Sequence, residues 1–411
     1  MICTRHINLG RLGPALLLLA AAAPVMRADL VLEWNTAMTH YTESQPQPGQ
    51  PSVELRAYAL AHLAMFHAIE HAGNSRGHPG AAGAQAAHDV LIKLFPGGAV
   101  DFNRLLEEQL ATMPDGPEKM LGRNQGAEAA LRLLAGRADD GFANGEGPYH
   151  PGTKPGDYQF TPPFEGYAHF PKLGQARPLA LKSPSQFRVP APPAVTDPAY
   201  AFDFNEIKVL GARHSPVRTA DQTNLARFWF EMSAYGWNRI ARILAAQHEG
   251  SLLEHARLFA LLNTAMTDTL VASFDSKYHY QFWRPITAIR AADTDGNPLT
   301  AADPDWEPLM LTPPMPDYPS AHAALGGAAE TVLAWYFDGD AQDFILPTTM
   351  VAEFPELRPR TFHHLSEAAM ENALSRMLVG IHFRSACLAG LKQGRDVGAW
   401  VVHHADIAAN R

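Results

Sequence analysis

The chain has 411 residues, of which 46% are hydrophobic and 9% aromatic, so it can bury a large core and is not of the disordered class. Its 33 basic and 42 acidic residues give a net charge of −9, which excludes a general cationic surface for nucleic acid or anionic lipid. Any site for an anion must therefore be local.

The first 28 residues have the pattern of an export signal. Arg5 and Arg11 come before or at the start of an apolar run at residues 12–25, which is too short to span a bilayer comfortably. We expect cleavage after Ala28 and a periplasmic or secreted mature chain without a membrane span. A retained membrane anchor is the alternative.

Removal of the signal also removes Cys3 and leaves Cys387 as the single cysteine. One cysteine cannot form an internal disulfide, so packing alone must stabilise the mature fold. We expect Cys387 to be a small buried side chain.

The first half of the mature chain contains two helical patterns followed by an irregular stretch. Apolar periodicity predicts helices at residues 53–72 and 118–137. Residues 139–197 are dense in proline and glycine, which excludes helices there. Because this stretch also carries Tyr and Phe residues that favour burial, we expect an ordered excursion.

Two capping boxes open the second half. Thr219 with Gln222 precedes a helical pattern at residues 224–247, and Ser251 with Glu254 begins another helix that continues toward residue 277. Strand-like alternation is almost absent. The sequence therefore predicts an all-α bundle with one domain at residues 29–411, whose chemically informative part is about residues 251–411.

The stretch KYHYQFWRPITAIR, residues 277–290, places Lys277 and Arg284 seven positions apart. On a continuous helix this spacing is close to two turns, so both side chains would point the same way. Pro285 disfavours helical geometry at Arg284. A lysine point charge and a planar guanidinium together suit a tetrahedral oxyanion; the alternative is a solvated basic face.

The stretch MPDYPSAH, residues 315–322, predicts a helix start with Ser320 as the N-cap. The amides of Ala321 and His322 would then be free at the positive end of the helix dipole, where anions bind. His322 could exchange protons with such an anion. The alternative is an ordinary capped helix with an incidental histidine.

The stretch SRMLVGIH, residues 375–382, contains Arg376 and His382, which would diverge on one unbroken helix. Gly380 offers a break, after which we expect a new helix starting at His382, so that both side chains can face one point. An imidazole there could ligate a metal-oxo centre or attack phosphorus. The alternative is a pair of apolar helices with a surface arginine.

Together the three stretches resemble the vanadium-dependent haloperoxidases and the type 2 phosphatidic acid phosphatases, and in particular the secreted bacterial haloperoxidase-like branch. The superfamily pattern is K-x6-R-P, then P-S-G-H, then S-R-x5-H, and here it is matched in that order at residues 277–285, 319–322 and 375–382. The resemblance implies that Lys277, Arg284 and Arg376 bind the oxygens of vanadate or phosphate. It also implies hydrogen bonds from Ser320 and the Ala321 amide.

The same resemblance assigns roles to the two histidines. His322 would be the general acid/base, and His382 the axial ligand of vanadium in an enzyme that oxidises halide with hydrogen peroxide and passes it to a small organic acceptor. One alternative is a cofactor-free acid phosphatase acting on soluble phosphate esters through a phosphorylated His382. Another is a protein that binds phosphate or vanadate without turnover.

Three positions depart from the superfamily pattern. Ala321 stands where the pattern has glycine, which crowds the backbone slightly. Ala386 stands where phosphatases have an aspartate that orients the histidine, so His382 needs another acceptor. Met315 replaces an aromatic residue, and its thioether would be oxidisable beside a hypohalite source.

Other features of the sequence give weaker alternatives. HAIEH at residues 67–71 fits a zinc-peptidase pattern, with a helix end decorated by histidines as the simpler interpretation. The pairs His363–His364 and His403–His404 lack metal-ligand spacing and are expected on the surface. Asp268 and Asp275 are expected to be solvated or to pair with a site arginine.

Overall fold

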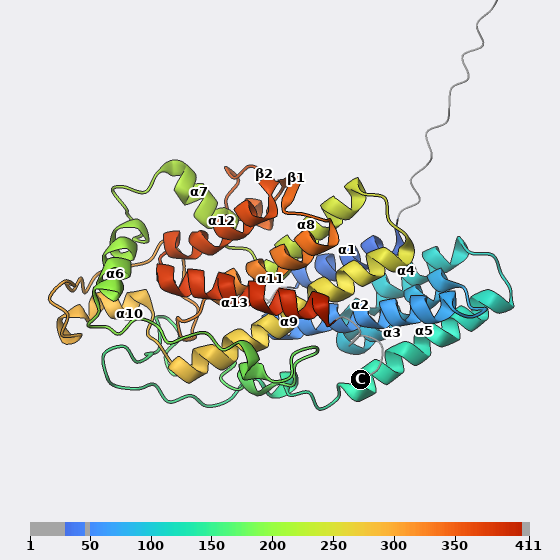
Figure 1. The fold of residues 1–411 in the computed structure, drawn as a ribbon, viewed down its shortest axis with the longest axis horizontal. Coiled ribbons are helices and arrows are strands. Elements are labelled where there is room, and N and C mark those ends of the chain that lie inside the picture. The colour runs from blue at the N-terminus through green and yellow to red at the C-terminus, as the bar shows by residue number, and fades with distance from the viewer. Residues whose placement is uncertain (1–28, 46–49, 405–411) are drawn as a thin grey trace, which may run out of the picture.

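The computed structural model describes residues 29–45 and 50–404 and confirms an all-α fold (Figure 1). The predicted export signal at residues 1–28 lies outside the described residues. The described part has one small antiparallel sheet, β1 (Ala341–Leu346) with β2 (Arg360–His364). Its α-helices are α1 (Leu30–Glu43), α2 (Pro51–Gly73), α3 (Pro79–Leu94), α4 (Ala99–Ala111), α5 (Pro117–Gly136), α6 (Pro198–Leu210), α7 (Ala220–Phe228), α8 (Ser233–Gln247), α9 (Leu252–Tyr280), α10 (Pro285–Arg290), α11 (Ala321–Tyr336), α12 (Leu365–Leu378) and α13 (Arg384–His403).

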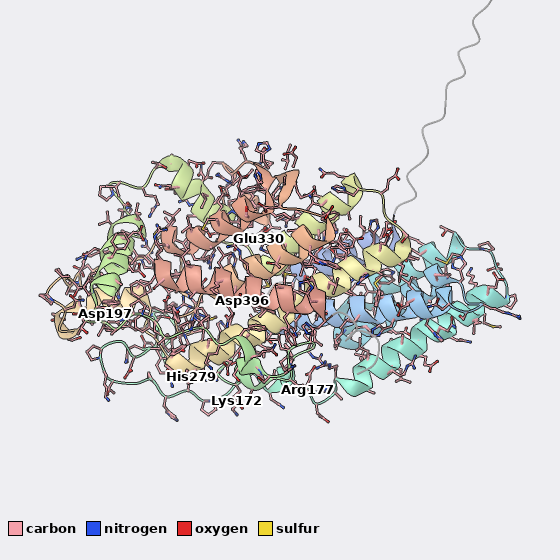
Figure 2. All side chains as sticks on the ribbon, in the orientation of Figure 1. Lys172, Arg177, Asp197, His279, Glu330 and Asp396 are labelled. Atoms are coloured by element: carbon pink, nitrogen blue, oxygen red, sulfur yellow. The ribbon has the colours of Figure 1, made fainter. Side chains whose placement is uncertain are left out.

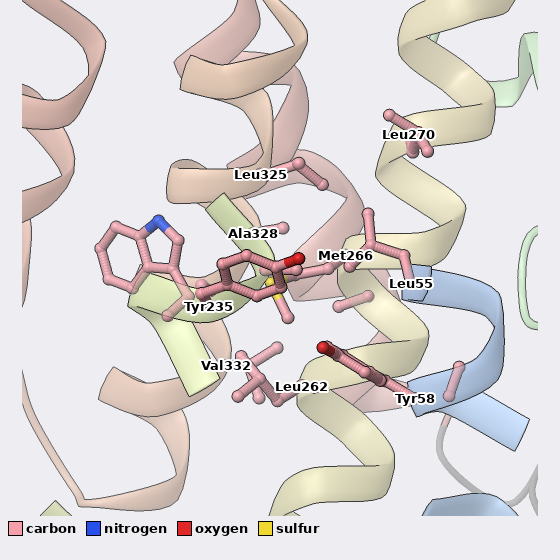
Figure 3. Packing of buried hydrophobic residues seen from close by; sticks show 14 of the residues in the cluster. Leu55, Tyr58, Tyr235, Leu262, Met266, Leu270, Leu325, Ala328 and Val332 are labelled. Carbon is pink, nitrogen blue, oxygen red and sulfur yellow. The ribbon is translucent and has the colours of Figure 1, made fainter. Parts of the chain in front are cut away.

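The long helix α9 joins the two ends of the molecule. It packs against α2 on one side and against α11 and α13 on the other, so it links the blue and teal N-terminal helices to the orange and red C-terminal helices (Figure 1). Each large apolar side chain buried along this axis contributes roughly 1.5–3 kcal/mol to folding. Figure 3 shows the centre of this packing, with side chains from α2, α9 and α11 that include Leu55, Tyr58, Leu262, Met266, Leu270, Leu325 and Val332.

Helices α11 and α13 approach each other closely because glycines line their contact. A Cβ atom on Gly390 would lie 2.3 Å from the carbonyl oxygen of Ser320. The amide of Ser320 also donates to the carbonyl of Ala386 at 2.9 Å. Farther along, Glu330 of α11 (labelled in Figure 2) accepts two hydrogen bonds from Arg395 of α13. The crossing of these helices therefore fixes the position of Ser320.

The proline- and glycine-rich excursion is ordered and partly buried, as predicted. It contains three 3₁₀ turns, at Phe142–Asn144, Leu173–Gln175 and Pro184–Phe187. Its backbone pairs with the chain between α9 and α10, because the Tyr158 amide donates to the Gln281 carbonyl at 2.6 Å and the Trp283 amide donates to the Gly156 carbonyl at 2.8 Å. The excursion thus holds the segment that leads into Arg284.

The single helix predicted at residues 224–247 is wrong, since α7 ends at Phe228 and α8 begins at Ser233. Glu231, in the interruption, is buried and accepts hydrogen bonds from Arg239 at 2.9 Å and from the amide of Thr349 at 2.9 Å. These tertiary contacts override the local preference for a continuous helix. Both predicted capping boxes, at Thr219 and Ser251, are confirmed.

The expected solvation of two aspartates on α9 is also wrong. Asp268 is fully buried and accepts hydrogen bonds from the three consecutive amides of residues 179–181, at 2.6, 2.6 and 2.8 Å. Asp275 forms a two-pronged ion pair with Arg188, at 2.7 and 2.8 Å, and not with a site arginine. In both cases residues of the excursion cover a face of α9 that we expected to be exposed to solvent.

The remaining histidine patterns have no metal cluster around them. Across residues 29–45 and 50–404, no group of three or more His, Cys, Asp or Glu side chains is placed to hold a metal ion, so the HAIEH stretch gains no support as a zinc site. The pairs His363–His364 and His403–His404 are exposed, as predicted. None of the helices within those ranges combines the length and the apolarity needed to cross a membrane.

Candidate oxyanion site

Lys277 and Arg284 come together at a corner of the chain and not along one helical face. Helix α9 ends at Tyr280, Gln281 takes a left-handed conformation with φ 49°, and Arg284 is the N-cap of α10. The prediction of a continuous helix through both residues is therefore wrong, although both side chains are fully buried. The two cations are therefore brought together by the turn between α9 and α10, which the excursion holds in place, and not by the helical repeat.

Both cations bind the same short backbone segment. Lys277 Nζ donates to the carbonyls of Pro316 at 2.7 Å and Asp317 at 3.0 Å. Arg284 Nε donates to the carbonyl of Met315 at 2.6 Å. Burial lowers the pKa of both groups. The charge of Arg284 lowers the pKa of Lys277 further, and the Asp317 carboxyl raises the pKa of each. The backbone carbonyls of residues 315–317, just before Ser320, thus accept hydrogen bonds from both cations.

Ser320 is the N-cap of α11, as predicted. Its hydroxyl accepts from the amide of Ala323 at 3.4 Å, and the first regular helical bond joins the Ala324 amide to the Ser320 carbonyl at 3.0 Å. The amides of Ala321 and His322 therefore precede the first hydrogen bond of the helix. Free amides at a helix N-terminus favour an anion.

His382 lies in the link between α12 and α13. Gly380 has φ 85°, a conformation that favours glycine, which confirms the predicted break. The next helix begins at Arg384, so the prediction that His382 starts it is wrong by two residues. The ring is almost fully buried, with Nδ1 2.8 Å from Asp317 Oδ1 and Nε2 3.0 Å from Arg284 Nη1.

Asp317 is the residue that the sequence reasoning missed. An arginine can only donate, so the contact with Arg284 makes His382 Nε2 the acceptor, and Nδ1 then carries the proton that Asp317 accepts. Asp317 thus takes the orienting role that Ala386 cannot fill. Burial raises the pKa of the Asp317 carboxyl to about 7, although Arg284 and Lys277 oppose this shift. The acid was visible in MPDYPSAH, but only the folded chain shows that it meets His382.

His322 and Arg376 are the remaining charged or titratable side chains of the predicted site. His322 Nδ1 lies 2.8 Å from Ser233 Oγ. Arg376 Nη1 donates to the carbonyl of Trp229 at 3.3 Å, and its guanidinium carbon lies 5.0 Å from the centre of the Phe230 ring. Burial, followed by the charge of Arg376, lowers the pKa of His322 well below its usual range. At neutral pH this histidine is uncharged.

The predicted site residues surround one point. Burial is the main cause that lowers the pKa of His382, and the charges of Arg284, Lys277, Arg376 and His322 lower it further, in that order. These four groups come from α9, α11, α12 and the start of α10, yet each acts on the same imidazole. The structure therefore brings Lys277, Arg284, His322 and Arg376 close enough to His382 to act on its protonation.

Atoms without partners indicate what the site can hold. Arg284 Nη2, Arg376 Nε and His322 Nε2 are buried and lack a hydrogen-bond partner among the described residues. Together with the amides of Ala321 and His322, they form a set of donors that fits a tetrahedral oxyanion such as vanadate or phosphate. Asp317 Oδ2 is an acceptor in the same state, and its raised pKa allows it to carry a proton near neutral pH.

Comparisons with known proteins agree with this geometry. Residues 257–410, which contain all three motifs, match the family model described as the VCPO second helical-bundle domain. The match identifies residues 257–410 as a domain of this type. Vanadium chloroperoxidase from Curvularia inaequalis is 30% identical, in a match that covers 36% of this chain and only 32% of that protein's length.

Two solved structures of this superfamily have the same fold as the chain. A bacterial vanadium-dependent iodoperoxidase superposes with a TM-score of 0.76 at 23% identity, covering 93% of this chain and 97% of the other. A holo-type bacterial vanadium-dependent chloroperoxidase superposes with a TM-score of 0.71 at 18% identity, and the match covers 90% of this chain and 96% of the other. At these identities the likeness establishes the architecture, and the reaction has to be argued from the site.

Proposed function

We propose that the protein is a vanadate-dependent haloperoxidase that oxidises halide with hydrogen peroxide. The observation that carries this proposal is a cluster of three buried cations with the buried His382 and the half-buried His322, in which two of the cations and His322 have unpartnered nitrogen atoms. A trianionic oxyanion in such an apolar bundle needs several positive charges to offset its desolvation. When bound, vanadate would supply the Lewis-acid centre that makes peroxide electrophilic toward halide.

Each site residue has a task in this reaction. Lys277, Arg284 and Arg376 balance the charge of the anion, and the helix start at Ser320 orients it. His382 would hold the anion through Nε2 once the Arg284 Nη1 contact at 3.0 Å gives way, because its proton stays on Nδ1 toward Asp317. His322 Nε2 takes and returns protons on the opposite side. The anion then binds at a preorganised site from which water is excluded.

An acid phosphatase is the second candidate, and the Asp317–His382 contact is the observation that favours it. A histidine that attacks phosphorus needs an orienting partner on its other nitrogen, and Asp317 provides one at 2.8 Å. The same lone pair on Nε2 could therefore attack a soluble phosphomonoester. The absence of an aspartate at position 386 no longer argues against this chemistry.

Two assays on one preparation separate these candidates. The vanadate-free protein is mixed with orthovanadate, peroxide and bromide, and bromination of a phenolic dye is followed across pH. In parallel, hydrolysis of p-nitrophenyl phosphate is measured without vanadate. We expect vanadate-dependent bromination; failure at every pH, together with rapid phosphate release, would make the phosphatase the better proposal.

One variant distinguishes an enzyme from a protein that binds vanadate or phosphate without turnover. His322→Ala removes the proton-exchanging imidazole but none of the cations, so an enzyme loses activity while orthovanadate binding persists. We also propose that the protein is exported after loss of residues 1–28. The N-terminal sequence of the protein recovered from the periplasm or medium would start at Asp29 if cleavage follows Ala28.

A further inference from the structure

Ser233 touches the ring of His322 although none of the three motifs includes it. It is the first residue of α8, directly after the interruption that separates α7 from α8, and its side chain is 4% exposed. Its Oγ lies 2.8 Å from His322 Nδ1. In the uninterrupted helix that the sequence alone predicts at residues 224–247, Ser233 would lie in the interior. In the structure it is at the start of α8.

The two histidines of the pocket therefore have partners with different hydrogen-bonding capacities. Asp317, when ionised, can only accept, and Arg284 can only donate, so His382 is confined to the form with its proton on Nδ1. A serine hydroxyl can accept or donate by rotating about its C–O bond. His322 Nε2 has no hydrogen bond of regular geometry among the described residues, although the Trp229 backbone is close enough to the ring to raise its pKa against the effect of burial.

We infer that Ser233 is a positioning residue that allows neutral His322 to carry its proton on either ring nitrogen. When Ser233 accepts from Nδ1, the lone pair of Nε2 faces the pocket and can take a proton from a bound reactant. When Ser233 donates to Nδ1, Nε2 carries the proton and donates a hydrogen bond to the bound anion. This inference rests on the proposed function, in which an anion occupies the pocket.

A neutral partner on Nδ1 suits this role better than a carboxylate. A carboxylate would hold the proton on Nδ1 and would favour the imidazolium form through its charge. Arg376 lies beside His322 and already disfavours that form. With serine, the same ring stays uncharged between turnovers and can still switch its protonated nitrogen.

Histidine ¹⁵N NMR tests the inference without relying on turnover. The two ring nitrogens of His322 and His382 are followed in the vanadate-free protein and after addition of orthovanadate. We expect His382 to keep its proton on Nδ1 in both states and His322 to move its proton to Nε2 when orthovanadate binds. A His322 spectrum that shows one fixed tautomer in both states, with orthovanadate bound, would overturn the inference.

Three variants add a functional measurement. Ser233→Ala removes the hydroxyl, and we expect turnover to fall about tenfold, the effect of losing one hydrogen bond in the reaction, while orthovanadate affinity stays within about twofold. Ser233→Thr keeps the hydroxyl and restores turnover. Ser52→Ala is the matched control, since Ser52 is also buried and its hydroxyl has no hydrogen-bond partner among the described residues.

Every outcome of this series is informative. If Ser233→Ala and Ser233→Thr lose turnover equally while the unfolding free energy is unchanged, packing and not the hydroxyl matters, and the inference is wrong. If Ser233→Ala matches the unaltered protein in turnover and in the His322 spectrum, it is wrong as well. If the unaltered protein brominates nothing, the proposed function fails, and the vanadate-free spectra of Ser233→Ala still show whether Ser233 sets the His322 tautomer.

Discussion

His382 and His322 belong to one cluster of site residues, but the two sides of that cluster are built differently. On the His382 side both ring nitrogens are engaged, by Asp317 and Arg284, and Lys277 binds only backbone carbonyls. On the His322 side one ring nitrogen lacks a partner within the described chain. The comparison teaches that one histidine is held at both ring nitrogens, whereas the other keeps hydrogen-bonding capacity that the proposed proton exchange would need.

The largest effects should come from removing each histidine in turn. His382→Ala is expected to abolish orthovanadate binding and turnover together, because it removes the nitrogen proposed to hold the vanadate. His322→Ala is expected to lower turnover by about 10²–10⁴-fold, the usual contribution of general acid/base catalysis, with binding retained. Isothermal titration with orthovanadate and bromination rates check this, with exposed His403→Ala as the control. Equal loss of binding in both variants would contradict the division between the two sides.

Asp317→Asn should reduce anion affinity or turnover by about 10–100-fold, as expected for the partner that orients a ligand histidine. The amide keeps the shape of the side chain but no longer carries the negative charge that holds the proton on Nδ1 of His382. Titration with orthovanadate measures the affinity. A variant with unchanged affinity and turnover would show that the backbone alone orients the ring.

The raised pKa of Asp317 predicts that the stability of the protein depends on pH. The pKa of Asp317 is raised from 3.8 to about 7, so between these values the folded state holds a proton that the unfolded state has lost. The contribution of Asp317 to stability therefore becomes less favourable as pH rises through this window, by at most about 1.4 kcal/mol per pH unit, and then stays level. Urea unfolding from pH 4 to 8 should show this slope in the unaltered protein relative to Asp317→Asn.

Gly390→Ala should disturb the contact between α11 and α13 at Ser320. The new methyl group would lie 2.3 Å from the Ser320 carbonyl, so α11 and α13 must separate, at a cost of about 1–3 kcal/mol in unfolding free energy. Displacement of Ser320 should weaken orthovanadate binding as well. Gly73→Ala is the control, because nothing lies within 4 Å of its added methyl group. Equal stability of both variants would show that the helix crossing is adjustable.

The smallest effect is expected at Phe230, on the His322 side. Phe230→Leu removes the ring that faces Arg376, which is worth about 0.5–1 kcal/mol, so orthovanadate affinity should fall about two- to fivefold. Phe354→Leu removes an equivalent ring, 4.5 Å from Arg227, outside the pocket, and should leave affinity unchanged. If both variants bind alike, the ring does not position Arg376.

The sequence was sufficient for the all-α class and for several helix starts, because these depend on local patterns. The capping boxes at Thr219 and Ser251 and the N-cap at Ser320 are examples. It failed where distant segments decide the conformation. The interruption at Glu231 depends on Arg239 and on a residue more than a hundred positions away.

The same limit applies to the site. The motif spacing identified His382 and Arg284 but implied a shared helical face, whereas a left-handed turn at Gln281 brings the arginine to the pocket. Asp317 and Ser233 were missed because their importance arises only from contacts with the two histidines. A residue that supports another side chain has no spacing rule of its own, so no single sequence can reveal it.

The buried carboxyl of Asp268 has a consequence for how the protein can be divided. The superfamily match begins at residue 257, which invites expression of the C-terminal half by itself. Yet Asp268 is satisfied by three amides at residues 179–181, far upstream of that boundary. A fragment cut at residue 257 would keep this acid and lose its amide donors, so we expect it to be insoluble alone and to recover when the upstream piece is co-expressed.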